Sequence, residues 1–354
     1  MDSITQAVLG ASVQGALLGR WQGRKALLYG AMLGTLPDLD VVLDFGDAVA
    51  DMTYHRGFSH SLLVLSLLSV LMAWMLRRFR PHPGYSGMRL WSCIWLVLTT
   101  HVLLDAFTTY GTQLFWPLTT PPVAISSIFI IDPLYTLPLL LAVIGGLAIG
   151  LQKRAGVRLQ HVALALGSLY LLSTLAGKQM ADQRLEQALV EMDIQPQATF
   201  SSPTPFNTLL WRVIAVDGDD YYEGLVSWFD DHPPRLERLP RHASAAQAVL
   251  ADSPQHQRLR WFTGDLLRYD LIDDQWVVTD LRLGMTGYHP FRFALARVEP
   301  TSGEAHLVEL AELWQAPSAQ LSALGFLLRR TLDENYPVSL QRLAEPLALS
   351  PTSP

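Results

Sequence analysis

Seven histidine and aspartate residues in the N-terminal half lie at the ends of apolar segments, where polar side chains are placed to do chemistry. They are Asp38, Asp40, His55, His60, His101, Asp105 and Asp132. His101 and Asp105 are four residues apart, so on a helix they share one face about 6 Å apart and form a chelating pair for a metal ion. Asp38 and Asp40 follow a proline, which favours an extended or turning backbone from which two carboxylates can clasp one cation or bridge two.

The residue types indicate which chemistry such a site would support. Three imidazoles with several carboxylates favour Zn²⁺, Mn²⁺ or Fe²⁺ over Ca²⁺, and the oxygen-rich balance keeps Mg²⁺ open. The site would lower the pKa of a bound water and make hydroxide for attack on an ester. Asp132 is a further carboxylate that would act as the general base, and Arg56 would hold an anionic group of the substrate.

Each residue also has a simpler interpretation. A single histidine near a helix end is commonly an interfacial residue with its hydrogen bonds satisfied, and Asp38 could be an ordinary helix cap. Asp132 precedes a proline and could simply start a helix. The convergence of all seven residues favours a metal site over these alternatives.

Six apolar segments must position these residues. They cover residues 4–19, 26–36, 61–76, 90–107, 134–151 and 159–177. The last four are predicted transmembrane helices, because a helix of about 20 apolar residues crosses the hydrocarbon layer. The first two are short and rich in small residues, and a packed or re-entrant helix pair is the alternative to two further passes.

Lys and Arg predict the orientation of these helices, because they are enriched in cytoplasmic connections. They gather in alternate connections, around Arg24, Arg78 and Lys153, whereas residues 90–152 contain neither type. The seven candidates therefore fall at the outer membrane face, and six passes place both termini and the C-terminal domain outside the cytoplasm. The Lys and Arg pattern does not depend on these seven residues, so their convergence independently supports one site.

Composition separates the 354 residues into two parts. Half of the residues are hydrophobic and 16% are charged, whereas about a quarter is usual in soluble proteins. Residues 1–180 hold 12 Lys and Arg against 8 Asp, a net charge of +4, and the remaining residues hold 14 against 24 acidic residues, a net charge of −10. The first 180 residues contain no Glu, which excludes an H-E-x-x-H protease motif there, and no basic nucleic-acid footprint is present.

The expected fold is an α-helical integral membrane domain of about five to six transmembrane helices over residues 1–180, a helical linker over 181–200, and a small β-rich α+β extracytoplasmic domain over 201–354. Residues 201–205 are predicted to break the linker helix. The C-terminal domain is expected to hold a small antiparallel sheet and two helical segments, 316–330 and 339–347. The predicted strands are 209–216, 221–229, 259–262, 275–283, 291–298 and 306–310.

Five motifs in this order resemble the YdjM-type family of bacterial inner-membrane proteins, described as membrane-bound metal-dependent hydrolases. They are residues 1–6 (MDSITQ), 36–40 (LPDLD), 55–61 (HRGFSHS), 100–105 (THVLLD) and 130–135 (IIDPLY). The resemblance covers residues 1–180 and continues through 203–207 (PTPFN). Many members have a histidine where this chain has Gln6.

The resemblance implies a divalent-metal hydrolase in the bacterial inner membrane, with zinc as the preferred ion. The ligands it implies are Asp38, Asp40, His55, His60, His101 and Asp105. Some relatives show distant similarity to zinc-dependent phospholipase C, which favours an ester or phosphoester of a lipid or lipid-linked substrate. The alternative is a non-catalytic or transporter-like membrane module with a structural metal site, whose C-terminal domain binds a protein partner.

Overall fold

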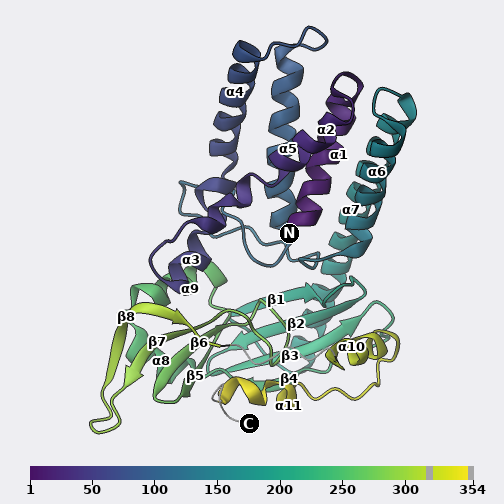
Figure 1. Cartoon of the computed structure of the whole chain (residues 1–354). Helices are drawn as coiled ribbons and strands as arrows, with labels where there is room; N and C mark the ends of the chain where they lie inside the picture. The colour runs from purple at the N-terminus through teal and green to yellow at the C-terminus, as the bar shows by residue number, and fades with distance from the viewer. Residues whose placement is uncertain (316–321, 350–354) are drawn as a thin grey trace. The chain divides into compact units, whose positions relative to one another are not determined.

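The structure is a computed structural model that describes residues 1–315 and 322–349 (Figure 1). The chain forms two compact units. The first comprises Met1–Leu43 and His55–Leu175, and the second comprises Asp44–Tyr54 and Ala176–Pro354. The short segment Asp44–Tyr54 therefore groups with the C-terminal residues, although it lies in sequence between the two aspartates and the two histidines of the predicted site.

The first unit is helical. Its helices are α1 (Ser3–Gln22), α2 (Lys25–Gly34), α4 (Leu62–Phe79), α5 (Gly87–Phe107), α6 (Pro133–Ile149) and the beginning of α7 (Arg154–Glu191). Among the described residues, α4, α5 and α7 are long and apolar enough to cross a membrane, and α6 is an apolar helix of 17 residues. These helices confirm the predicted helical, apolar character of the N-terminal region.

Helices α1 and α2 pack as a pair whose axes approach closely. A Cβ atom on Gly10 would lie 2.3 Å from the carbonyl oxygen of Gly30, so only glycine permits this contact. Helix α2 has 10 residues and rises only about 15 Å, half the thickness of the hydrocarbon layer. These features agree with the packed-pair alternative for the two short apolar segments.

Two 3₁₀ segments carry residues of the predicted site. Segment η1 (Pro37–Val42) comes directly after α2, and η2 (Phe58–His60) comes directly before α4. Pro37 begins η1, where its missing N–H costs no helical hydrogen bond. Ser61 then caps α4 by accepting a hydrogen bond from the Val64 backbone N–H.

The second unit contains two four-stranded antiparallel sheets, in the strand orders β1-β2-β3-β4 and β5-β6-β7-β8. The strands are β1 (Ala198–Pro203), β2 (Leu210–Asp217), β3 (Asp220–Ser227), β4 (Glu237–Pro240), β5 (Leu267–Ile272), β6 (Gln275–Asp280), β7 (Arg292–Val298) and β8 (Ala305–Leu313). The helical elements are α3 (Ala48–Tyr54), α8 (Ala243–Leu250), α9 (Pro254–Thr263), α10 (Ser322–Leu332), α11 (Leu340–Ala344) and η3 (Glu345–Ala348).

The end of α7 belongs to the core of this unit. Leu185 and Leu189 of α7 pack with Trp211 and Val213 of β2. The other side of the same strand contributes Ile214 to a core that it shares with residues of α11 and η3. This packing explains why α7 continues without a break from the apolar helices into the C-terminal unit.

Three expectations for this unit need correction. Residues 259–262 are helical and not a strand, because Ser253 and Pro254 start α9 and Gly264 ends it. Residues 201–203 lie in β1, an edge strand on which a proline is tolerated. The linker helix therefore does not end at residues 201–205 as predicted, but earlier, at Glu191. The strands form two sheets and not one. Of the predicted helix 316–330, residues 316–321 lie outside the described residues.

Candidate metal centre

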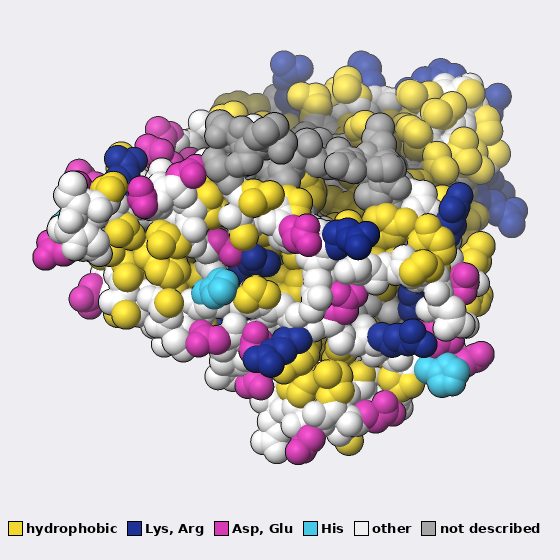
Figure 2. All heavy atoms as spheres, turned by 90° about the horizontal axis from the view of Figure 1, so that it is seen from below, with side chains coloured by type: hydrophobic (Ala, Val, Ile, Leu, Met, Phe, Trp, Pro, Cys, Tyr) yellow, Lys and Arg dark blue, Asp and Glu magenta, His cyan; other side chains and the backbone are white. Residues whose placement is uncertain are grey.

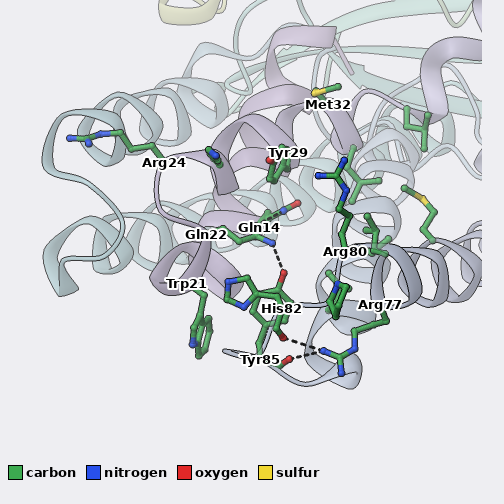
Figure 3. A pocket seen from close by; sticks show the side chains of 18 of the residues that line it. Gln14, Trp21, Gln22, Arg24, Tyr29, Met32, Arg77, Arg80, His82 and Tyr85 are labelled. Carbon is green, nitrogen blue, oxygen red and sulfur yellow. Dashed lines mark hydrogen bonds between the residues drawn. The ribbon is translucent and has the colours of Figure 1, made fainter.

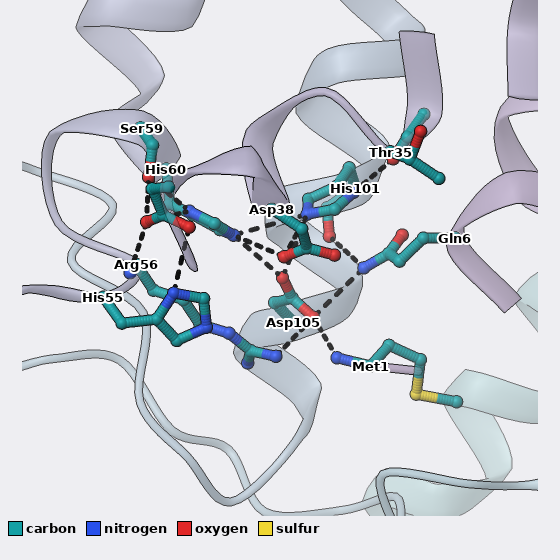
Figure 4. A network of polar contacts seen from close by, with 12 residues as sticks. Met1, Gln6, Thr35, Asp38, His55, Arg56, Ser59, His60, His101 and Asp105 are labelled. Atoms are coloured by element: carbon teal, nitrogen blue, oxygen red, sulfur yellow. Dashed lines mark hydrogen bonds and ion pairs between the residues drawn. The ribbon is translucent and has the colours of Figure 1, made fainter. Parts of the chain in front are cut away.

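Three elements of the first unit bring four of the predicted ligands together (Figure 4). Asp38 comes from η1, His60 ends η2, and His101 and Asp105 lie on one face of α5. One donor atom from each of these four side chains lies within 4.8 Å of all the others. His60, His101 and Asp105 are buried, and the side chain of Asp38 is 20% exposed.

The two imidazoles face the two carboxylates at short range. The Nε2 atoms of His60 and His101 are 3.3 Å apart, and each lies 3.2 Å from Asp105 Oδ2. Each Nε2 atom is also 3.4 Å from Asp38 Oδ1. The four donor atoms therefore surround one small volume.

The hydrogen bonds on the far side of each ring determine which nitrogen carries the proton. His101 Nδ1 lies 2.6 Å from the Gly34 carbonyl oxygen, which can only accept, so Nδ1 carries the hydrogen. The Ser59 hydroxyl donates to Asp40 Oδ2 at 2.5 Å, so its oxygen must accept from His60 Nδ1, 2.9 Å away. In the neutral rings both Nε2 atoms consequently present lone pairs to the cluster.

The two carboxylate oxygens of Asp105 have different surroundings. Its Oδ1 atom accepts from Gln6 Nε2 at 3.0 Å, lies 3.3 Å from an Arg56 guanidinium nitrogen, and also contacts the Met1 amine. Its Oδ2 atom is buried and has no hydrogen-bond donor among the described residues. A buried carboxylate oxygen without a donor is costly, unless a cation accepts its lone pairs.

These observations test whether a divalent ion fits the residues present. A tetrahedral ion with bonds of about 2.0–2.1 Å holds its ligand atoms roughly 3.3 Å apart. The five donor separations given above, 3.2–3.4 Å, agree with this value. Protonating both rings instead would place two cationic N–H groups against each other. The donor set fits a metal ion and could hold one.

Asp40 and His55 lie beside the four-residue cluster and contact each other. His55 Nδ1 is 2.9 Å from Asp40 Oδ1, and Asp40 Oδ2 accepts from the Arg56 backbone N–H at 3.0 Å. Burial opposes ionisation of Asp40, but the hydrogen bonds from His55 and Ser59 outweigh it and hold its carboxyl pKa below the usual value. Asp40 thus fastens the histidine-containing segment to η1, and its role as a ligand stays a prediction.

Asp38 is ionised for a similar reason. Burial raises the pKa of its carboxyl, but His101 and His60 more than compensate when a proton lies on the Nε2 atom of either ring, and they then hold the pKa well below its ordinary range. A carboxylate that stays charged is a suitable ligand for a cation.

Arg56 and Asp132 occupy different positions. Arg56 is buried against Asp105, and its Nε atom has no partner among the described residues. Asp132 caps α6 by accepting from the backbone N–H groups of Leu134 and Tyr135, and its other oxygen accepts from the Tyr170 hydroxyl at 2.7 Å. These contacts agree with the alternative in which Asp132 starts a helix.

Sequence reasoning did not identify two groups that orient the histidines. Ser59 lies inside the His55–His60 motif, so its position in the sequence could have indicated a contact with His60. The carbonyl of Gly34 carried no signal, because any residue has a carbonyl and only the packing of α2 beside α5 aims it at His101.

Apolar helices long enough to cross a membrane, and a buried His/Asp cluster that could hold a metal ion, define a membrane protein with a candidate metal centre. The chain belongs to the YdjM inner membrane protein family, which matches residues 1–181.

Two relatives extend the comparison. The chain is 27% identical over 311 residues to the uncharacterized protein YfhP of Bacillus subtilis (strain 168), covering 82% of this chain and 89% of YfhP. It is 37% identical over 95 residues to the inner membrane protein YbcI of Escherichia coli (strain K12), covering 26% of this chain and 52% of YbcI. No solved structure gives a significant match.

Proposed function

We propose that the protein is a metal-dependent hydrolase of the inner membrane whose ion is held by Asp38, His60, His101 and Asp105. One observation carries the proposal. Four lone-pair donor atoms surround one volume, and the five separations given above between them are 3.2–3.4 Å. The Nδ1 atom of each imidazole is hydrogen-bonded to a group outside the cluster. The arrangement leaves lone pairs facing one another unless a proton or a cation lies between them, and a divalent cation would engage all four donors.

Zinc is the ion that we propose. Two imidazoles with two carboxylates are common zinc ligands, and the donor separations match tetrahedral coordination. Manganese, iron and magnesium stay alternatives, since they accept the same donor types in octahedral geometry.

The proposed chemistry is hydrolysis of an ester or phosphoester. When bound, the ion supplies Lewis acidity and makes water acidic enough to act as a nucleophile at neutral pH. His55 is placed to take a proton, because Asp40 holds its Nδ1 atom and its side chain is 21% exposed. Arg56 supplies positive charge beside the cluster for an anionic group of the substrate.

A lipid or lipid-linked substrate is favoured by the surroundings of the site. Residues of η1 next to Asp38 expose apolar side chains, and Val41 and Val42 are 70% and 78% exposed. Phe58, in η2, is also exposed. Exposed apolar groups around a polar centre are typical of a surface that meets lipid.

The positions of the basic residues support an outward-facing site. In the first unit the α1–α2, α4–α5 and α6–α7 connections lie at one end of the helices (Figure 1) and carry most of its Lys and Arg. The positive-inside rule places that end in the cytoplasm. We therefore propose about five to six membrane-crossing segments, with the metal centre and the C-terminal unit on the extracytoplasmic side.

A structural metal site is the second candidate function, and one observation favours it. Four protein ligands close a tetrahedral site, whereas catalytic zinc usually has three and an open position. Asp38 is the most exposed of the four, so an enzyme would need this ligand to be displaced or the ion to take a fifth. The C-terminal unit would then bind a protein partner. On the face shown in Figure 2 its described side chains are a mixture of hydrophobic, acidic and basic groups, so that expectation stays a prediction.

The test is to purify the protein in detergent without added metal, and to measure bound metals per chain and release of phosphate-containing headgroups from phospholipids. The native chain should hold one equivalent and hydrolyse lipid, and His101→Ala should lose both. Asp44→Asn, a charge change in the second unit, is the control. Metal without turnover of any ester or phosphoester would favour the structural site. A folded native chain without metal would contradict both candidates.

A further inference from the structure

A large cavity lies in the helical unit, between the α1–α2 pair and helices α4 and α5 (Figure 3). Its volume is about 1150 Å³, larger than the roughly 300–1,000 Å³ of an ordinary small-molecule pocket. Its wall follows α2 from Lys25 through Tyr29 and Met32, and continues beyond the helix to Leu36. It is an elongated chamber along a short helix.

Part of the cavity wall is apolar. Leu33, Met72, Leu90 and Ile94 contribute aliphatic and thioether surface from three helices. A chamber of this shape and lining accommodates a hydrocarbon chain better than a polar metabolite.

One end of the cavity is basic. Arg24, Lys25, Arg77 and Arg80 line it, and no acidic residue is found among the lining residues that the structure describes. Arg77 is turned toward the α4–α5 connection, where it donates to the carbonyl oxygens of His82 and Tyr85 at 3.2 Å. In the described part of the chain, Lys25 and Arg80 have no ion-pair partner, so their charges are available to a ligand.

A chain of polar groups also reaches the cavity wall. The buried Gln14 side chain donates to Gln22 at 2.9 Å, and Gln22 donates to the Tyr85 hydroxyl at 3.1 Å. The tyrosine oxygen thus acts as an acceptor, and its own hydrogen remains for another group. A hydroxyl donor in a cavity that two unpaired cations also line is a suitable partner for a phosphate or ester oxygen.

We propose that this cavity binds a membrane phospholipid with an acidic headgroup. Its acyl chain would fill the apolar chamber, and its phosphate would meet Lys25, Arg80 and the Tyr85 hydroxyl. The charge complementarity supports this occupant, because basic pockets between membrane helices at a cytoplasmic face bind anionic headgroups. The site is separate from the metal centre and does not depend on the proposed hydrolase activity.

The experiment compares lipid retention by native mass spectrometry of the detergent-solubilised full chain. Phosphatidylglycerol and phosphatidylethanolamine with identical acyl chains are added in turn. The native protein should retain phosphatidylglycerol preferentially, and Lys25→Gln/Arg80→Gln should reduce that preference by roughly thirtyfold, as two interfacial charges are lost. Lys153→Gln/Arg158→Gln is the matched control, since these residues lie at the same end of the helices but outside the cavity.

A second variant tests the chamber itself. Met72→Trp fills part of the cavity and should lower the retention of both lipids. An unchanged size-exclusion elution profile would show that the variant is still folded. Absence of any headgroup preference in the native protein would overturn the proposal. So would equal losses in the test and control double variants, or unaltered retention by Met72→Trp.

Discussion

The Nε2 atoms of His60 and His101 lie 3.3 Å apart, while the Nδ1 atom of each ring is held by a different partner, Ser59 for one and the Gly34 carbonyl for the other. Fixing one ring nitrogen determines what the other can do. Both free nitrogens are therefore placed to act as ligands for a cation, and the same orientation would be unfavourable between two imidazolium ions.

Metal binding should stabilise the folded chain, because the four donors are assembled only after folding. Zn²⁺ at about 100 times its Kd should raise the free energy of unfolding by about 2.7 kcal/mol, and chelation should reverse this. The thermal midpoint in detergent measures the effect. His101→Ala should abolish it, whereas His161→Ala, which removes an exposed histidine of α7, should respond like the native chain. An equal response from His101→Ala would contradict the assignment.

Substitutions at Asp132 should separate helix capping from catalysis. Asp132→Asn keeps a capping oxygen and should leave stability and metal content unchanged. Asp132→Ala removes the cap of α6 and should cost about 0.5–2 kcal/mol. Thermal unfolding and bound metal would be measured for both variants. If Asp132→Asn lost lipid hydrolysis while its stability stayed unchanged, the result would support the predicted catalytic role and contradict a role in capping alone.

Arg258 should hold the segment Asp44–Tyr54 within the second unit. Its guanidinium donates to the Thr53 hydroxyl at 2.7 Å and lies 3.8 Å from the centre of the Tyr54 ring. Hydrogen bonds to charged groups contribute about 1.5–3 kcal/mol, so Arg258→Ala should lower the free energy of local opening of this segment by roughly that amount. Backbone hydrogen exchange in the segment should therefore become at least about tenfold faster.

The matched control for this exchange experiment is Arg260→Ala, on the same helix but paired with Asp265. It should leave exchange of residues 44–54 unchanged. Because this segment joins Asp40 to His55 in sequence, metal content would be measured for both variants, and a loss is expected for Arg258→Ala alone. Unchanged exchange in Arg258→Ala would show that other contacts secure α3.

His289 should make the second unit less stable in acid. Burial, reinforced by Arg212, holds the pKa of this imidazole well below its ordinary value of 6.5. Above pH 6.5 the ring is neutral in both the folded and unfolded states. Below it only the unfolded chain takes up the proton, so stability falls by as much as about 1.4 kcal/mol per pH unit.

The measurement is urea unfolding at pH 7.5 and 5.5, followed by tryptophan fluorescence. His289→Gln should reduce the loss between the two pH values by about 1.4 kcal/mol. His256, whose pKa is also lowered by burial, would account for part of the remaining loss. His306→Gln, at an exposed position, should lose as much stability as the native chain, and the same loss in His289→Gln would disprove the assignment.

Much of the helical unit was predictable from local patterns. Apolar runs long enough to cross a membrane indicate helices, because leaving backbone polar groups without hydrogen bonds is too costly in an apolar environment. The spacing of His101 and Asp105 likewise places both on one face of α5, whatever surrounds that helix. The sequence alone therefore determined the helical segments and the polar residues at their ends.

The tertiary structure decided which of those polar residues meet. Asp38 and Asp40 are two positions apart and chemically identical, yet Asp38 faces His60 and His101 whereas Asp40 bonds to His55 and Ser59. The turn of η1 sets this difference.

Two further features depended on contacts between segments distant in sequence. The Gly34 carbonyl reaches His101 because α1, α2 and α5 pack together, and Asp44–Tyr54 joins the second unit through residues some 200 positions away, including Arg258. Periodicity and composition report how each segment is solvated. They do not report which distant segment it contacts, because that depends on the packing of the whole chain.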